Sequence, residues 1–305
     1  SKKVKLAEGV DLAVVARGTP GYSGAELANV INEAALLAAR RGLKGITLAE
    51  LEEARDKVRW GKERRSLALS EKEKQNTAYH EAGHALLLEL LPHTEPLHKV
   101  TIIPRGPSLG STMWLPEEDK YTNRKNELLA GLAVSMGGRV AEEITFGDIT
   151  NGARGDIKMS TAIARRMVCE WGMSEKMGMV EYGDHEDYVF LGRDISRARD
   201  YSEATAEQID QEVKKLLDDA YRLAKETLSA HRDKLEVIAK ALLEYETLDG
   251  SQLKEIVEHG RLIHPPPSIS PPPSEKMPPE KPPKQVIAAP DVTPPLPGAL
   301  GGAPA

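Results

Sequence analysis

The chain has 305 residues, of which 40% are hydrophobic and 29% charged, a composition typical of a soluble globular protein with about two compact domains. Its formal net charge of −6 excludes the concentrated basic surface that nucleic-acid binding needs, so no nucleic-acid partner is expected. A single cysteine, Cys169, excludes an internal disulfide framework, and no apolar run reaches the roughly 18 residues of a membrane-spanning helix.

The first 66 residues have the pattern of short helices. Ser23-Gly-Ala-Glu26 and Thr47-Leu-Ala-Glu50 are capping boxes, in which a hydroxyl and a carboxylate satisfy the free amide groups of a helix start. Between the two boxes, apolar residues recur at helical spacing, namely Leu27, Val30, Ile31, Ala34, Ala35 and Ala38. We therefore expect a small helical subdomain over residues 1–66.

A second folded part is predicted over residues 67–263. It opens with a third capping box, Ser70-Glu-Lys-Glu73, and the helix that follows ends just before Pro92. Two short strands come next, Lys99-Val-Thr-Ile-Ile103 and Ser111-Thr-Met-Trp-Leu115, each followed by proline and separated by a Pro-Arg-Gly-Pro turn. These strands predict a small sheet beside the helix.

Helical patterns return at about residues 123–143, 156–170 and 202–228. The last of these is amphipathic, with a predicted buried stripe of Ile209, Val213, Leu216, Leu217, Ala220, Leu223 and Leu228. A last pair of short helices is predicted to end near Ile263. The segment beyond it, residues 264–305, contains 15 of the 21 prolines and is predicted to be disordered. The expected fold is thus mainly α with a small β-sheet (α+β).

The segment His80-Glu-Ala-Gly-His84 predicts a zinc site within the helix that precedes Pro92. Two histidines four residues apart lie on the same helix face, so both can offer an imidazole nitrogen to one metal ion. Glu81 lies beside them as a candidate general base, which would take a proton from water and pass it to the leaving amine. Gly83, in mid-helix, costs about 1 kcal/mol relative to alanine, which indicates a close approach of another backbone.

A catalytic zinc usually has three protein ligands, and the spacing leaves the third one open. The metzincin pattern is excluded, because the positions it reserves for glycine and histidine hold Leu87 and Leu90. The remaining candidates are the Glu142-Glu143 pair and Asp156, and the residues alone do not decide between them.

Several separated segments between about residues 5 and 260 resemble the C-terminal half of the FtsH family, the membrane-bound AAA+ zinc proteases. Thr19–Leu27 and Asn32–Arg41 resemble the lid of the family's ATPase. The segments that resemble its M41 peptidase domain are Ala78–Ala85, His98–Gly106, Leu115–Asp119, Gly137–Arg139 with Ala141–Glu143, and Val189–Arg193.

This resemblance implies an AAA+ lid over residues 1–66 and an M41-type zinc peptidase over residues 67–263. It also implies that Asp156 is the third zinc ligand, with His80 and His84, and that each chain binds one Zn²⁺. The sequence departs from the family's pattern at Asn151, where threonine is usual, and at Gly155, where asparagine is usual. Glu142 and Glu143 then become candidates for orienting a ligand imidazole.

The resemblance further implies a substrate site and partners. The strand residues Ser111, Thr112, Met113 and Trp114 are predicted to bind an extended substrate through its backbone. Unfolded or membrane proteins are the implied substrates, and a homohexamer is the implied assembly. The sequence has no phosphate-binding loop, so ATP would act only through an ATPase core that is missing from this chain. A missing N-terminal segment would attach the intact protein to the cytoplasmic face of the bacterial inner membrane.

Two alternatives stay open at this point. The first is a non-catalytic assembly or chaperone-like subunit of the same family, although the intact residues His80, Glu81, His84 and Asp156 argue against it. The second is a gluzincin-like aminopeptidase in which Glu142 or Glu143 is the third ligand.

Overall fold

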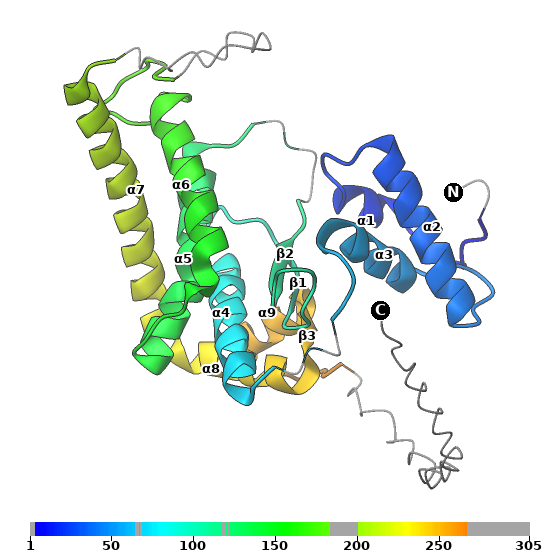
Figure 1. The fold of residues 1–305 in the computed structure, drawn as a ribbon. Helices are drawn as coiled ribbons and strands as arrows, with labels where there is room; N and C mark the ends of the chain where they lie inside the picture. Colours follow the sequence, from blue (N-terminus) through cyan, green and yellow to red (C-terminus); the bar gives the residue numbers. More distant parts are fainter. Residues whose placement is uncertain are drawn as a thin grey trace, which may run out of the picture. The chain divides into compact units, whose positions relative to one another are not determined.

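The structure is a computed structural model of the chain (Figure 1). Two predicted features lie outside the described residues: the segment Val189–Arg193 and, from residue 267 onward, the proline-rich tail. The described residues are 4–64, 67, 69–116, 120, 122–183 and 201–266.

The predicted fold class is confirmed, since the described residues are mostly helical and contain one small antiparallel sheet. The first three helices are α1 (Leu12–Arg17), α2 (Gly24–Arg40) and α3 (Leu48–Trp60). Both predicted capping boxes are present at the starts of α2 and α3. These helices share a hydrophobic core of Val15, Val30, Ala34, Ala38, Ile46, Leu51 and Ala54.

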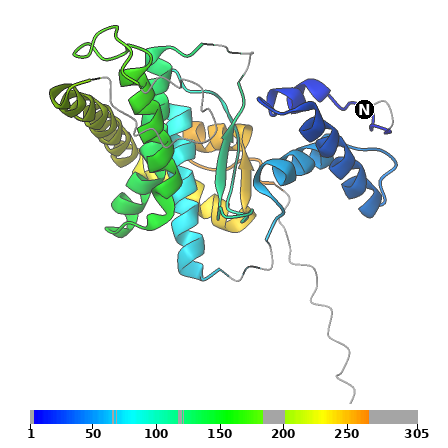
Figure 2. The same cartoon turned by 45° about the horizontal axis from the view of Figure 1, so that its top comes forward.

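The central helix of the second part is α4 (Glu71–Leu90), which begins at the third predicted capping box and ends before Pro92. In Figures 1 and 2 this cyan helix lies between the sheet and the helices α5, α6 and α7. The remaining helices are α5 (Lys125–Phe146), the short 3-10 helix η1 (Asn151–Ala153), α6 (Arg154–Cys169), α7 (Glu203–Ala230), α8 (Arg232–Tyr245) and α9 (Gly250–His259).

The sheet has the strand order β2-β1-β3 and packs beside α4. Its strands are β1 (Leu97–Thr101), β2 (Ser111–Trp114) and β3 (Thr247–Asp249). β1 pairs antiparallel with both neighbours, and Val100 faces Thr112 of β2 and Leu248 of β3. β2 is therefore an edge strand. The sequence predicted β1 and β2 but missed β3, because three residues are too few for a period-2 pattern to be recognised.

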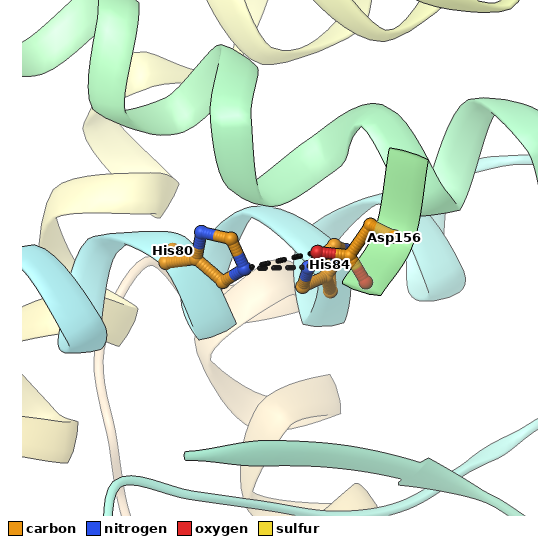
Figure 3. Close-up of side chains that lie close together, drawn as sticks. All are labelled: His80, His84 and Asp156. Carbon is orange, nitrogen blue, oxygen red and sulfur yellow. Dashed lines mark hydrogen bonds and ion pairs between the residues drawn. The ribbon is translucent and has the colours of Figure 1, made fainter. Parts of the chain in front are cut away.

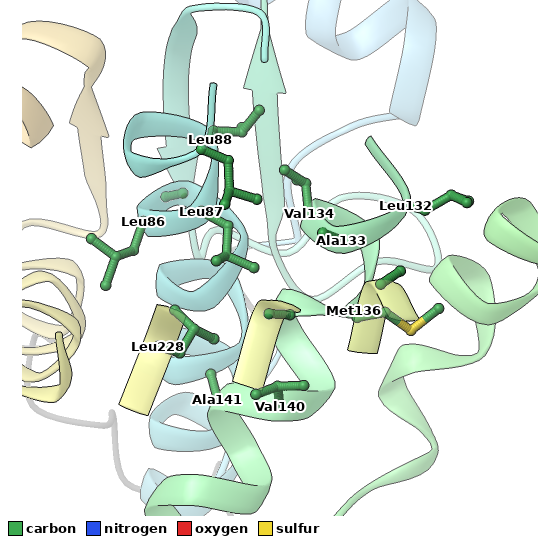
Figure 4. Packing of buried hydrophobic residues seen from close by; sticks show 14 of the residues in the cluster. Leu86, Leu87, Leu88, Leu132, Ala133, Val134, Met136, Val140, Ala141 and Leu228 are labelled. Atoms are coloured by element: carbon green, nitrogen blue, oxygen red, sulfur yellow. The ribbon is translucent and has the colours of Figure 1, made fainter. Parts of the chain in front are cut away.

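The main hydrophobic core forms where α4 meets α5, α7 and α8. Leucine side chains from the last turns of α4 interdigitate there with small and branched side chains of α5 (Figure 4). The labelled core residues are Leu86, Leu87, Leu88, Leu132, Ala133, Val134, Met136, Val140, Ala141 and Leu228.

The backbones of α4 and α5 approach each other closely at Gly83 and Gly137. A Cβ added at Gly137 would lie 2.8 Å from the carbonyl oxygen of Gly83, and one added at Gly83 would lie 2.7 Å from the Cβ of Ala141. Neither position has room for a side chain. The expectation of a close backbone approach at Gly83 is thus confirmed.

Replacing Gly83 with alanine is expected to destabilise the fold by about 1 to 3 kcal/mol, because the added methyl group overpacks the contact between α4 and α5. The control is Gly131→Ala on α5, where an added Cβ meets nothing within 4 Å. That variant should be neutral or gain up to about 1 kcal/mol from helix propensity. Urea unfolding followed by circular dichroism measures both, and equal stabilities would contradict the close-contact account.

Helix α7 corrects one part of the predicted stripe. Ile209, Val213, Ala220 and Leu228 are buried, but Leu223 is 42% exposed and Ala224 is buried in its place. The buried face continues from Ala220 to Leu228 in steps of four residues, and Leu223 points about 100° away from Ala224 on the helix.

Ion pairs join α3 to the sheet. Glu52 pairs with Nε2 of His98 at 3.1 Å, and Asp56, which is 1% exposed, pairs with Lys99. The neighbouring Glu53 binds Arg105 at 2.8 Å. Since His98 and Lys99 belong to β1, the strand beside β2 is fixed to α3 by charged contacts.

Candidate metal centre

Helices α4 and α6 bring His80, His84 and Asp156 together (Figure 3). Both imidazoles project from the same face of α4, as the four-residue spacing predicts. Asp156 lies in the first turn of α6, which follows directly after η1. The two Nε2 atoms are 3.1 Å apart, and Oδ2 of Asp156 lies 3.3 Å from Nε2 of His80 and 3.6 Å from Nε2 of His84.

These distances fit a zinc ion. In a tetrahedral site with bonds of about 2.0–2.1 Å, neighbouring ligand atoms are roughly 3.3 Å apart. The three measured separations lie close to that value. Two imidazole nitrogens and one carboxylate oxygen are also a ligand set that zinc accepts while keeping a fourth position open.

The second nitrogen of each imidazole is held by the protein. Nδ1 of His80 lies 2.8 Å from Oε1 of Glu142, and Nδ1 of His84 lies 2.7 Å from the carbonyl oxygen of Val134. Both partners accept a hydrogen bond, so Nδ1 of each ring carries a proton and Nε2 is the nitrogen that offers its lone pair to a metal once the ring is neutral. The rings are thereby oriented before any ion binds.

The charges around the ligands are strongly coupled. Burial alone would lower the pKa of His80, but hydrogen bonds with Asp156 and Glu142 outweigh it and raise the pKa to about 10. Burial would raise the pKa of Asp156, but contacts with His80 and His84 hold it well below its usual range. Without a metal, a positive charge on His80 therefore balances the carboxylates.

Zinc binding at neutral pH is expected to release about one proton from His80, because a ligand imidazole must be neutral. Since the pKa of His80 is about 10, this competition makes the apparent zinc affinity rise about tenfold per pH unit between pH 7 and 9. Calorimetric titration in two buffers with different ionisation enthalpies measures the released proton. Identical heats in both buffers, together with a pH-independent affinity, would show that zinc binding releases no proton from His80.

Glu81 lies on α4 between the two histidines in sequence and is 7% exposed. It lines a cleft of about 890 Å³ together with His80, His84 and Asp156. Apolar side chains from three other regions also line this cleft, among them Leu109, Trp114, Leu128, Met159 and Ile163. A carboxylate, three metal-ligand atoms and apolar walls thus meet in one cleft.

The predicted substrate strand borders the same cleft. Ser111, Thr112 and Trp114 of β2 line it, whereas the side chain of Met113 is buried on the opposite face of the sheet. Only the backbone of Met113 is therefore available to a peptide in the cleft. Trp114 is 45% exposed.

Glu142 and Glu143, the two candidates for orienting a ligand imidazole, contact different neighbours. Oε1 of Glu142 contacts His80, and Oε2 accepts a hydrogen bond of 2.8 Å from the backbone amide of Thr150. Glu143 instead accepts hydrogen bonds from Tyr221 at 2.5 Å and Lys225 at 2.8 Å, both on α7. Of these two glutamates, Glu142 is the one that lies within hydrogen-bond reach of a ligand imidazole.

The sequence did not predict three contacts around the site: Val134 with His84, Thr150 with Glu142, and Thr112 with Glu81. Two of these contacts use backbone atoms, which leave no signal in residue type. The third contact joins side chains of a helix and a strand, and it forms only because β2 packs against α4 in the folded chain.

Comparison with protein families agrees with this arrangement. The model of peptidase family M41 matches residues 67–256, and that of the AAA+ lid domain matches residues 9–53. The chain belongs to peptidase family M41. The M41 match includes all three candidate metal ligands and Glu81.

Curated relatives place this M41 chain in the FtsH family, as its motifs predicted. The "ATP-dependent zinc metalloprotease FtsH 2" of Methylacidiphilum infernorum is 60% identical over 266 residues, which are 87% of this chain and 42% of that protein. The "ATP-dependent zinc metalloprotease FtsH" of Akkermansia muciniphila is 58% identical over 285 residues, 93% of this chain and 35% of that protein. The chain thus spans about two fifths of the length of these relatives.

Among the described residues, no helix is both long and apolar enough to cross a membrane.

Proposed function

We propose that this M41 chain is the proteolytic part of an ATP-dependent zinc endopeptidase that cuts unfolded or membrane proteins. The observation that carries the proposal is the set of three ligand atoms from His80, His84 and Asp156, separated by 3.1–3.6 Å. These atoms border the cleft that also contains Glu81.

The reaction follows from the roles of the residues around the cleft. When bound, zinc supplies Lewis acidity, which makes water a stronger acid at neutral pH and polarises a peptide carbonyl. Glu81 takes the proton from the attacking water and passes it to the leaving amine. Glu142 keeps the His80 ring in the orientation and tautomer that direct Nε2 to the metal.

The substrate enters as an extended strand along β2. Since β2 lies at the edge of the three-stranded sheet, its outer backbone groups can pair with a peptide. Backbone pairing selects little for side-chain identity, which suits an enzyme that degrades many unfolded chains. Ser111 and Trp114 contact the bound peptide from the cleft side.

The remaining assignments rest on the relatives and their names. We assign residues 1–66 to the lid of an AAA+ ATPase, which the family match over residues 9–53 supports, and residues 67–263 to the peptidase, which the match over residues 67–256 supports. The relatives named above are ATP-dependent and extend well beyond the matched region, so an ATPase core elsewhere in the intact protein would feed substrates to the cleft. A homohexamer attached to the membrane is the proposed assembly.

The test is cleavage of casein, a loosely folded protein that does not need unfolding by an ATPase. Mass spectrometry should detect fragments cut at internal bonds, and removal of zinc by a chelator followed by its return should abolish and restore cleavage. Stepwise release of N-terminal residues would instead favour an aminopeptidase. Casein binding without cleavage, in a zinc-loaded protein, would favour a non-catalytic subunit.

A further inference from the structure

The Glu81 carboxylate is held from the side of the sheet by Thr112. Oγ1 of Thr112 lies 2.6 Å from Oε2 of Glu81 and 3.3 Å from the backbone carbonyl oxygen of the same residue. A hydroxyl has one hydrogen to donate, and the shorter contact to the carboxylate is the favourable one. Hydrogen bonds to a charged acceptor are roughly twice as strong as neutral ones.

The pleat of β2 directs the Thr112 side chain towards α4. Successive side chains of a strand point to opposite faces, and the side chain of Met113 is buried on the face opposite the cleft. Thr112 and Trp114 therefore share the other face and line the cleft. A shift of β2 by one residue would turn Thr112 away from Glu81, so this contact depends on the pairing of β2 with β1.

Gly110, just before β2, packs against the stem of Glu81. A Cβ added at Gly110 would lie 2.7 Å from Cγ and 2.8 Å from Oε1 of Glu81. The missing side chain of Gly110 thus leaves room for the stem and for Oε1 of Glu81, and rotation of a carboxylate about its last bond has broad energy wells. Among the residues that the structure describes, Thr112 is the side chain that hydrogen-bonds this carboxylate and limits its rotation.

We propose that Thr112 is a positioning residue for the general base: it holds Oε2 of Glu81 and leaves Oε1 to accept the proton from water. This inference rests on the proposed function, in which Glu81 is the base. The strand β2 then has two tasks, since its edge receives the peptide and its Thr112 hydroxyl aligns the base. Substrate position and base position are thereby set by one strand.

The test compares Thr112→Val, Thr112→Ser and wild type on an internally quenched peptide derived from casein, with bound zinc measured in each. Valine has nearly the same shape as threonine but donates no hydrogen bond. The kcat of Thr112→Val should fall about 10- to 100-fold, the loss expected for a hydrogen bond to a charged group, with KM and zinc content unchanged. Thr112→Ser should recover most of kcat. Thr227→Val, at a partly buried position of α7 outside the cleft, is the matched control.

A double-mutant cycle separates positioning from a general structural effect. In a Glu81→Gln background, Thr112→Val should cause no further loss, because the group that it aligns is gone. An unchanged kcat in Thr112→Val, a loss confined to KM, or an equal loss in the Glu81→Gln background would each overturn the positioning role. Wild-type cleavage and zinc content, measured in the same series, test the proposed function separately.

Discussion

Glu81→Gln is expected to lower the rate of peptide-bond cleavage about a hundred- to ten-thousandfold, the usual contribution of a general base. Glutamine has the shape of glutamate and can still accept the hydrogen bond from Thr112, but its amide oxygen is too weak a base to take a proton from water. Because Glu81 does not belong to the ligand group, zinc content should stay unchanged.

The measurement is kcat on a quenched peptide, paired with elemental analysis of the same preparation. Glu89→Gln serves as the matched control, since Glu89 lies on the same helix outside the cleft. A Glu81→Gln protein that cleaves at the wild-type rate would assign the base to another residue. Loss of zinc together with activity would instead make Glu81 part of the metal site.

Asp156→Ala is expected to weaken zinc binding more than any substitution of a neighbouring glutamate. Removal of Asp156 leaves two imidazoles from one helix and takes away the carboxylate that bridges α4 to α6. Loss of a residue that hydrogen-bonds to a metal ligand usually lowers metal affinity about 10- to 100-fold, and loss of a ligand itself should lower it further. Competition with a chelator of known affinity measures the difference.

The two adjacent glutamates provide graded controls for this experiment. Glu142→Ala removes the partner of the His80 ring and should weaken zinc binding about 10- to 100-fold. Glu143→Ala breaks contacts with α7 only, and zinc affinity should stay at the wild-type value. A larger loss of zinc affinity in Glu142→Ala than in Asp156→Ala would make Glu142 the third ligand and Asp156 the supporting residue.

The sequence predicted those parts of the site that lie on one helix. Capping at Ser70 and termination before Pro92 define α4, and helical periodicity then places His80 and His84 on one face. These are local properties of the chain. The prediction at Gly83 succeeded for a related reason, because a mid-helix glycine has a cost that only a tertiary contact explains.

The third ligand could not be chosen from spacing, since it depends on how α5 and α6 pack against α4. Both Glu142 and Asp156 lie within reach of the His80 ring in the folded chain, one at each nitrogen. Adjacent residues on a helix point about 100° apart, so only one of Glu142 and Glu143 can face α4. Nothing in the sequence of α5 says which of the two it is.

The exposed Leu223 shows that the sequence also does not fully predict which residues of α7 are buried. Periodicity predicts a buried stripe on α7, but a leucine and an alanine at neighbouring positions compete for its centre. The packing of α7 on α5 and α6 selects Ala224, the smaller residue, and leaves Leu223 in solvent. Hydrophobicity alone favours the opposite choice.

If His80, His84 and Asp156 bind one zinc ion, elemental analysis of freshly purified protein should detect it. This measurement does not depend on ATP, assembly or substrate. We expect about one zinc per wild-type chain and none in His84→Ala, in which one of the three ligands is missing. Wild-type protein without zinc, or full zinc content in His84→Ala, would contradict the account.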